Sequence, residues 1–189
     1  MEKTAVQKLA GVLKVLVTVT LVCNLVALLL VPGMSLMKGP EELLALTPYE
    51  NPLEVPLRVG IAFVLSWGWV WTAGVYEVVL ALFLLFCGIC TAVILWQGRR
   101  VLGTILTGAP FRAENGVSLR RAAVCCFLIA AAALARVVWG LFYYGSVAPL
   151  LTYNALFVPI FILGGLLCLV MSALFRQVAE LKAENDLTI

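Results

Sequence analysis

The chain has 189 residues, of which 63% are hydrophobic and 12% are charged, and its formal net charge is +3. Soluble domains are about 45–50% apolar and about 25% charged, so this chain has too few polar side chains to cover a water-exposed surface. The composition therefore predicts an integral membrane protein with a single membrane domain over 1–189. It excludes an additional soluble catalytic domain.

Four stretches are long and apolar enough to cross a bilayer, whose hydrocarbon core of about 30 Å needs roughly 20 residues of helix. They cover about 9–31, 73–96, 122–144 and 153–175. Because these runs are continuously apolar and do not alternate as barrel strands do, they predict an all-α membrane protein, a four-transmembrane-helix bundle. The first run ends without a small-residue cleavage site, so we expect a retained span rather than a signal peptide.

Lysines and arginines are distributed unevenly around the predicted spans. Of the 13 cations, Lys38 and Arg58 lie between the first two spans, Arg136 lies inside the third, and the rest flank the opposite ends of the spans. Positive charge beside a span stays cytoplasmic. The pattern therefore predicts that both termini, the 97–121 loop and the 176–189 tail are cytosolic, and that 32–72 is an extracytoplasmic loop.

The 32–72 loop has an acidic first half and an apolar second half. In the first half, Gly39-Pro40-Glu41-Glu42 predicts a helix start, with acids at the positive end of the helix dipole. If the second half, VGIAFVLSWGWVW, crossed the membrane, the arginine-rich 97–121 loop would lie outside the cell. We therefore expect it at the outer interface, where Trp67, Trp69 and Trp71 suit an aromatic belt. A ligand-capturing flap is the alternative.

The 97–121 loop is the most basic segment of the chain. Its first part, RRVLGTIL, has an apolar face and is predicted to lie flat on the membrane surface. Asn115-Gly116 then predicts a turn, and Ser118 predicts the N-cap of the third span. The loop is either a basic connector or a docking surface for a cytosolic partner.

Beyond the fourth span, the apolar positions Leu174, Val178 and Leu181 predict that the helix continues into the cytosol as a stalk. Such a stalk is either a solvated helix end or, together with the basic loop, a platform for a protein partner. The candidate docking residues share a cytosolic position, and they are Arg99, Arg100, Phe111, Arg112, Asn115, Arg120, Arg121, Leu181 and Glu184.

Three polar residues fall at similar depths in the outer half of the predicted bundle. At a helical rise of 1.5 Å per residue, Arg136 lies about 12 Å, Glu77 about 8 Å and Asn24 about 10 Å below the outer surface. A charge in hydrocarbon costs at least about 2.5–3.5 kcal/mol and therefore needs a partner. We predict an ion pair between Arg136 and Glu77 supported by Asn24, acting either as a structural clamp or as a polar pocket for a ligand or ion.

Small residues predict where helices approach closely. Ala131 and Ala135 form a small-xxx-small pair in the third span, and Gly164-Gly165 have the same role in the fourth. Pro159 predicts a kink near the outer end of the fourth span.

The residues needed for enzymatic chemistry are scarce. The chain has no histidine, which removes the commonest general base and metal ligand, and no glycine loop that would cradle phosphates. Cys87 and Cys90 have the C-x-x-C spacing of thiol oxidoreductases, but they fall inside a span where reactive thiolate is suppressed. We expect packing roles for the six cysteines, with a buried thiol or metal cluster as the alternative. No cofactor, metal or catalytic residue is predicted.

The segment GAPFRAENGVSLRR and the ending LFRQVAELKAENDLTI resemble the DUF2975 family of bacterial four-span membrane proteins. The resemblance rests on Pro110-Phe111, Asn115, Leu119-Arg120 and the 184–189 tail in the second half of the chain. It implies location in the bacterial cell membrane, and because the family's biochemical activity is not established, no catalytic residue is carried over to this chain. Members are often encoded beside a small helix-turn-helix regulator of the Cro/CI type, which implies such a regulator as partner.

These observations lead to a non-enzymatic regulator or sensor as the first hypothesis. It would sit in the lipid bilayer, bind a cytosolic transcription regulator, and make no direct contact with nucleic acid. A homo-oligomer is compatible with this hypothesis. A small transporter or channel, or an accessory subunit of an export system, is the alternative, and a thiol-redox enzyme is the third.

Overall fold

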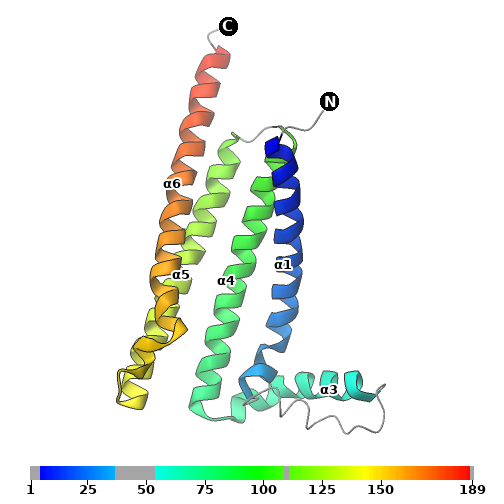
Figure 1. Ribbon diagram of the computed structural model, residues 1–189, viewed down its shortest axis with the longest axis vertical. Helices are drawn as coiled ribbons and strands as arrows, with labels where there is room; N and C mark the ends of the chain where they lie inside the picture. The colour runs from blue at the N-terminus through cyan, green and yellow to red at the C-terminus, as the bar shows by residue number, and fades with distance from the viewer. Residues whose placement is uncertain (1–4, 37–53, 109–110, 188–189) are drawn as a thin grey trace. The chain divides into compact units, whose positions relative to one another are not determined.

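A computed structural model describes residues 5–36, 54–108 and 111–187, and the described residues contain helices and no strand. This confirms the all-α prediction. The predicted helix start at Gly39-Pro40 lies outside the described residues. In chain order the elements (Figure 1) are α1 Ala5–Leu36, α3 Glu54–Trp69, η1 Val70–Thr72, α4 Val75–Leu106, α5 Ala113–Tyr144, η2 Ala148–Leu151 and α6 Tyr153–Leu187.

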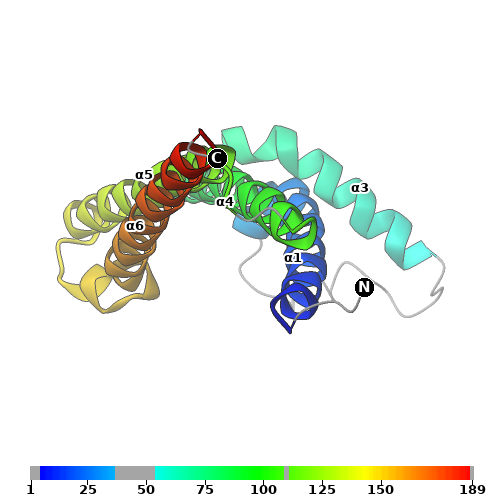
Figure 2. The ribbon, with the colours of Figure 1, turned by 90° about the horizontal axis from the view of Figure 1, so that it is seen from above.

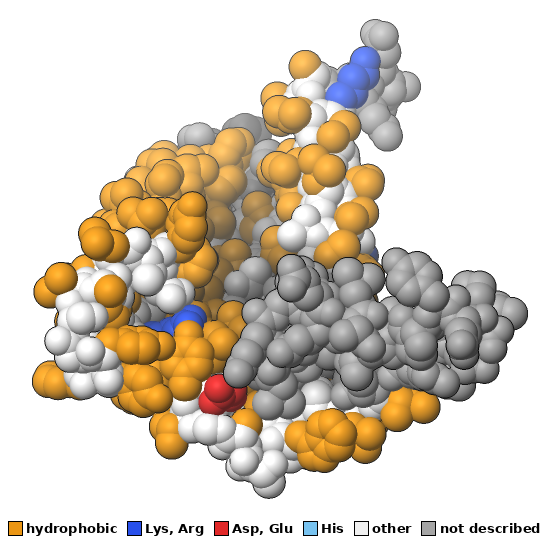
Figure 3. Space-filling view, turned by 60° about the horizontal axis from the view of Figure 1, so that its bottom comes forward, with side chains coloured by type: hydrophobic (Ala, Val, Ile, Leu, Met, Phe, Trp, Pro, Cys, Tyr) orange, Lys and Arg blue, Asp and Glu red, His pale blue; other side chains and the backbone are white. Residues whose placement is uncertain are grey.

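Four of these helices are long and apolar enough to cross a membrane, over Ala5–Gly33, Val75–Leu106, Ala113–Tyr144 and Tyr153–Glu184. The predicted number of spans is therefore confirmed by helix length and composition. Large hydrophobic side chains remain exposed along these helices, and hydrophobic side chains cover much of the described surface in Figure 3. Contiguous apolar surface of this extent needs a covering, and lipid provides it. The apolar segment before the second span is the separate 16-residue helix α3.

The chain divides into two compact units, residues 1–24 with 89–189 and residues 25–88. In the 25–88 unit, Val31, Val70 and Ala81 form a small buried core. The indole Nε1 of Trp67 donates a hydrogen bond of 3.1 Å to the carbonyl oxygen of Leu29. Thus α3 and η1 are attached to the end of α1 by both a polar and an apolar contact.

In the other unit, α5 and α6 form an antiparallel helical hairpin, and Figures 1 and 2 both show them side by side. Gly145 ends α5 in the left-handed conformation, with φ 58°, and its N–H bonds the carbonyl oxygen of Leu141 at 3.0 Å. Glycine adopts this conformation without a steric penalty and is the usual residue after a helix C-terminus. The short helix η2 then leads directly into α6.

The buried face of α5 includes Cys126, Ala130, Ala133, Val137 and Gly140. Their spacing of three and four residues places them on one side of the helix. The predicted small-xxx-small pair is therefore wrong, because Ala131 and Ala135 are exposed. These two residues fall between the positions that face neighbouring helices.

Of the two glycines predicted at a close helix contact, only Gly165 lies at one. A Cβ on Gly165 would lie 2.9 Å from ring atoms of Phe127 of α5, whereas a Cβ on Gly164 would meet no atom within 4 Å. Gly165 is therefore the close-approach position. Pro159 lies inside α6, as the sequence indicates.

Three local predictions for the basic loop are wrong. RRVLGTIL is not a separate surface helix, because α4 continues without a break to Leu106. Asn115 and Gly116 do not form a turn, because they lie in the first turns of α5. Arg112, with extended φ −106° and ψ 140°, occupies the N-cap position predicted for Ser118. Near a membrane, continued helix satisfies backbone hydrogen-bonding groups that an open loop would leave unpaired.

Candidate functional site

The site begins where α4 ends. Gly108 has φ 75°, and its N–H bonds the carbonyl oxygen of Ile105 at 3.1 Å. The Thr107 hydroxyl donates to the carbonyl oxygen of Thr104 at 2.9 Å. These bonds pair carbonyl groups that the helix end leaves without an intrahelical partner. The end of α4 is thus closed locally, so the chain can turn into α5 within a few residues.

A partly buried hydrogen bond joins the two helices across this turn. Asn115 is only 2% exposed, and its Nδ2 donates to Thr104 Oγ1 at 2.7 Å. The Thr104 hydroxyl in turn donates to the carbonyl oxygen of Val101 at 2.7 Å. A buried amide without a partner is costly, so this bond fixes the first turn of α5 against the last turns of α4. Because Asn115 is buried, it is not part of the exposed docking surface that the sequence predicted.

The same turn of α5 is fixed to α6. Ser172 Oγ donates a buried hydrogen bond of 2.7 Å to the carbonyl oxygen of Gly116. A Cβ on Gly116 would lie 2.8 Å from Arg176 Cγ and 3.1 Å from the Ser172 carbonyl oxygen. Only glycine permits so close an approach. The sequence pattern does not mark Thr104 or Ser172, because each acts through a partner on another helix.

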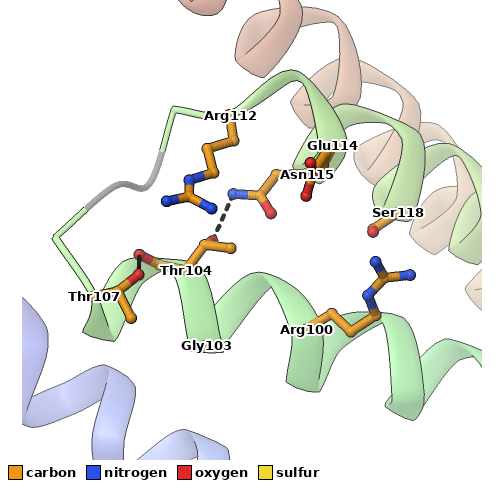
Figure 4. Close-up of a pocket in the computed structure, with 8 residues that line it drawn as sticks. All are labelled: Arg100, Gly103, Thr104, Thr107, Arg112, Glu114, Asn115 and Ser118. Carbon is orange, nitrogen blue, oxygen red and sulfur yellow. Dashed lines mark hydrogen bonds between the residues drawn. The ribbon is translucent and has the colours of Figure 1, made fainter.

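A cavity of about 270 Å³ opens between the end of α4 and the start of α5. Figure 4 shows the guanidinium of Arg100 reaching toward Ser118 and that of Arg112 lying on the other side of the Thr104–Asn115 hydrogen bond. The structure thus brings together three of the predicted docking residues, which come from two helices. The lining residues are Arg100, Gly103, Thr104, Thr107, Arg112, Glu114, Asn115 and Ser118.

Two further cavities contain the remaining predicted arginines of this region. One of about 310 Å³ is lined by Lys14, Trp96, Arg99, Arg100 and Gly103. The other, of about 420 Å³, is mainly apolar and has Arg120 and Arg121 in its lining. All five arginines between 99 and 121 therefore line a cavity.

The remaining docking candidates lie on or beside α6. Phe111 packs against Phe175, with ring centroids 5.8 Å apart. Leu181 is 60% exposed, and Glu184 is also exposed. Phe111 therefore helps to attach the turn to α6, whereas Leu181 and Glu184 lie on the extended part of that helix.

The predicted intramembrane cluster is distributed over both units. Arg136 is half-buried in α5, and its Nη1 donates a long bond of 3.4 Å to Asn154 Oδ1 of α6. Asn154 is a partner that sequence analysis missed. Glu77 lies in the first turn of α4 within the 25–88 unit. Asn24 Oδ1 is buried and accepts no hydrogen bond among the described residues. The Arg136–Glu77 ion pair would join the two units, and it stays a prediction.

Four cysteines lie in two pairs between neighbouring helices. Cys90 of α4 pairs with Cys125 of α5, and Cys126 of α5 pairs with Cys168 of α6. None of the six cysteines is in a disulfide. Within the described ranges no group of three or more His, Cys, Asp or Glu side chains could hold a metal ion. Each pair lies at a helix interface, where cysteine packs as a small apolar side chain.

Comparison with known proteins adds one finding. Residues 15–189 match the family described as "Protein of unknown function (DUF2975)". The match extends the resemblance into the first half of the chain. No curated protein and no solved structure matches the chain.

Proposed function

We propose that this chain, which belongs to the DUF2975 family, is a non-enzymatic regulator or sensor of the bacterial cell membrane. Its four helices cross the bilayer with both termini, the α4–α5 turn and the end of α6 in the cytosol. There it binds a partner protein, for which a helix-turn-helix transcription regulator is the candidate. The uneven distribution of cations supports this orientation.

The observation that carries the proposal is a pair of interhelical hydrogen bonds beside the α4–α5 turn, one partly buried and one buried. Asn115 connects α5 to Thr104 of α4 at 2.7 Å, and the neighbouring Gly116 accepts from Ser172 of α6 at 2.7 Å. Three spanning helices are thereby fixed to one another at the same end. A displacement of α4 would pass through α5 to α6, which is the mechanical requirement for reporting a membrane event to a cytosolic partner.

The helix α6 supplies the surface for that partner. It has 35 residues, which at 1.5 Å per residue gives about 52 Å, well beyond a hydrocarbon core of about 30 Å. Leu174 and Leu181 are 48% and 60% exposed, and charged side chains surround them near the end of the helix. An exposed apolar stripe flanked by charges is suited to helix-in-groove recognition.

The test is recovery of a tagged candidate regulator by the full chain from solubilised membranes. Leu181→Glu should lower recovery about tenfold, equivalent to about 1.4 kcal/mol of binding, because it places a charge in the apolar stripe. Lys182→Arg, at the adjacent exposed position, keeps the charge and should leave recovery unchanged. Equal recovery by both variants would contradict the proposal.

A small transporter or channel, or an export accessory subunit, is the second candidate, and Arg136 favours it. This residue is half-buried in a spanning helix and bonded to Asn154 of α6, and intramembrane charges often line substrate paths. Flux across proteoliposomes that disappears in Arg136→Gln but persists in Leu181→Glu would support transport. Absence of flux in the unsubstituted chain would exclude it.

A further inference from the structure

The cavity between α4 and α5 lies at the depth of lipid headgroups. Both helices qualify as membrane spans, and the chain passes from one to the other between Leu106 and Ala113. Arg100 lies six residues before the end of α4, or about 9 Å along the helix at 1.5 Å per residue. The turn between two spanning helices must lie at a bilayer face, whichever side that is. The cavity is therefore located where phosphate groups are concentrated.

The side chains of the cavity are suited to an oxyanion. Arg100 of α4 and Arg112 at the N-cap of α5 line it on either side of the Thr104–Asn115 hydrogen bond (Figure 4). A guanidinium presents N–H donors in a planar fork that fits two oxygens of one phosphate. Thr104 and Asn115 are bonded to each other, so they form a rigid wall between the two forks.

The start of α5 adds further donors. Arg112 is at the N-cap position, and the first N–H groups of a helix have no intrahelical acceptor. Of these groups, the Asn115 N–H bonds the Arg112 carbonyl oxygen at 3.0 Å. The positive end of the helix dipole favours an anion at this position.

One carboxylate opposes the two guanidinium groups. Glu114 lines the same cavity and lies in the first turn of α5. Its charge repels an anion, so both arginines are needed to keep the cavity positive. Removal of Glu114 and removal of an arginine should therefore have opposite effects on anion binding.

A second basic cavity adjoins the first and shares Arg100 and Gly103 with it. Lys14 and Arg99 add positive charge there, and Trp96 adds an indole of the kind enriched at membrane interfaces. Basic pockets between spanning helices are typical binding sites for anionic headgroups. Arg100 therefore stands between two positions that an anionic group can occupy.

We propose that the α4–α5 cavity is a binding site for a phosphate group, held between Arg100 and Arg112 at the N-terminus of α5. An anionic phospholipid headgroup and a soluble phosphate both have this chemistry. The site is distinct from the Leu181 surface of α6, so it does not depend on the proposed partner.

The experiment uses the full chain in phosphatidylcholine nanodiscs that contain a minor fraction of phosphatidylglycerol. Native mass spectrometry after detergent release measures the phosphatidylglycerol retained by each variant. Arg100→Gln and Arg112→Gln should each weaken retention about tenfold, which corresponds to about 1.4 kcal/mol. Glu114→Gln should strengthen it, because a repulsive charge is removed. Lys182→Gln, which removes one exposed charge near the end of α6, should leave retention unchanged.

Inorganic phosphate distinguishes the two sources. If excess inorganic phosphate displaces phosphatidylglycerol from the unsubstituted chain and not from Arg112→Gln, the site accepts soluble phosphate. If it displaces none, the site is specific for the headgroup of a lipid. The proposal would be overturned if Arg100→Gln and Arg112→Gln retained as much phosphatidylglycerol as Lys182→Gln. Unchanged retention in Glu114→Gln would also overturn it. Because Glu114 is exposed, this variant should keep the helix packing intact, and it therefore tests the proposal even if an arginine variant misfolds.

Discussion

The helices α1 and α5 have the same length, 32 residues, and both qualify as membrane spans, yet they differ in packing. In the most apolar 18-residue stretch of α5, 39% of the residues are buried inside the protein, against 17% in α1. An apolar side chain gains little free energy by moving from lipid into contact with another helix, so hydrophobicity alone does not bring membrane helices together. The difference must come from the kinds of residues that the two helices carry.

Small side chains account for much of this difference. The buried face of α5 includes Ala122, Ala123, Ala130, Ala133 and Gly140, which allow neighbouring backbones to approach. The helix α1 instead exposes branched aliphatic side chains, which suit contact with lipid. These include Val12, Val15, Leu16, Val19 and Val22.

Glycine substitutions provide the largest expected contrast between the two helices. Gly116→Ala should lower the free energy of unfolding by about 1–3 kcal/mol, the usual cost of overpacking. The added Cβ would lie 3.1 Å from the Ser172 backbone oxygen, which cannot easily move, and 2.8 Å from Arg176 Cγ. Reversible unfolding in mixed micelles, followed by circular dichroism, gives the value.

Gly11→Ala is the matched substitution on α1. Its Cβ would be 3.8 Å from Leu106 Cδ2, an ordinary contact, so the higher helix propensity of alanine should raise the free energy of unfolding by up to about 1 kcal/mol. A loss as large as that of Gly116→Ala would show that α1 is packed as tightly as α5.

Hydroxyl groups provide a second, smaller contrast. Ser172 Oγ donates a buried bond from α6 to the Gly116 carbonyl oxygen of α5 at 2.7 Å, so Ser172→Ala should cost about 0.5–1.5 kcal/mol of unfolding free energy. Thr20 Oγ1 donates an exposed bond within α1 to the Leu16 carbonyl oxygen at 2.9 Å. Thr20→Val should therefore change the unfolding free energy little. Equal losses in the two variants, measured in the same micelles, would contradict the interhelical role of Ser172.

The spans were predictable because their signal is local. Each apolar run is its own helix, and bilayer thickness sets the required length. The helix ends were not predictable in the same way. Asn115 and Gly116 have a strong local preference for a turn, but Thr104 and Ser172 supply partners that make helix the better conformation. Those partners are 11 and 56 residues away in the sequence.

The candidate site was likewise predictable only in part. The positive charge of Arg100 and Arg112 marks their segment as important, and both line the α4–α5 cavity. Which side chains contact one another depends on helix rotation, which the sequence pattern of α5 did not define. Ala131 and Ala135 have suitable spacing for packing, yet they are exposed because the buried face includes Ala130 and Ala133.

The smallest expected coupling concerns Arg136 of α5, which bonds a side chain of α6, whereas the buried Oδ1 of Asn24 in α1 has no hydrogen-bond partner among the described residues. Arg136 Nη1 bonds Asn154 Oδ1 at 3.4 Å, and side-chain hydrogen bonds between membrane helices average about 0.6 kcal/mol. A double-mutant cycle of Arg136→Ala and Asn154→Ala should give a coupling free energy of this size. The same cycle with Glu77→Ala tests the ion pair predicted from sequence. Additive losses there would mean that Arg136 and Glu77 do not interact.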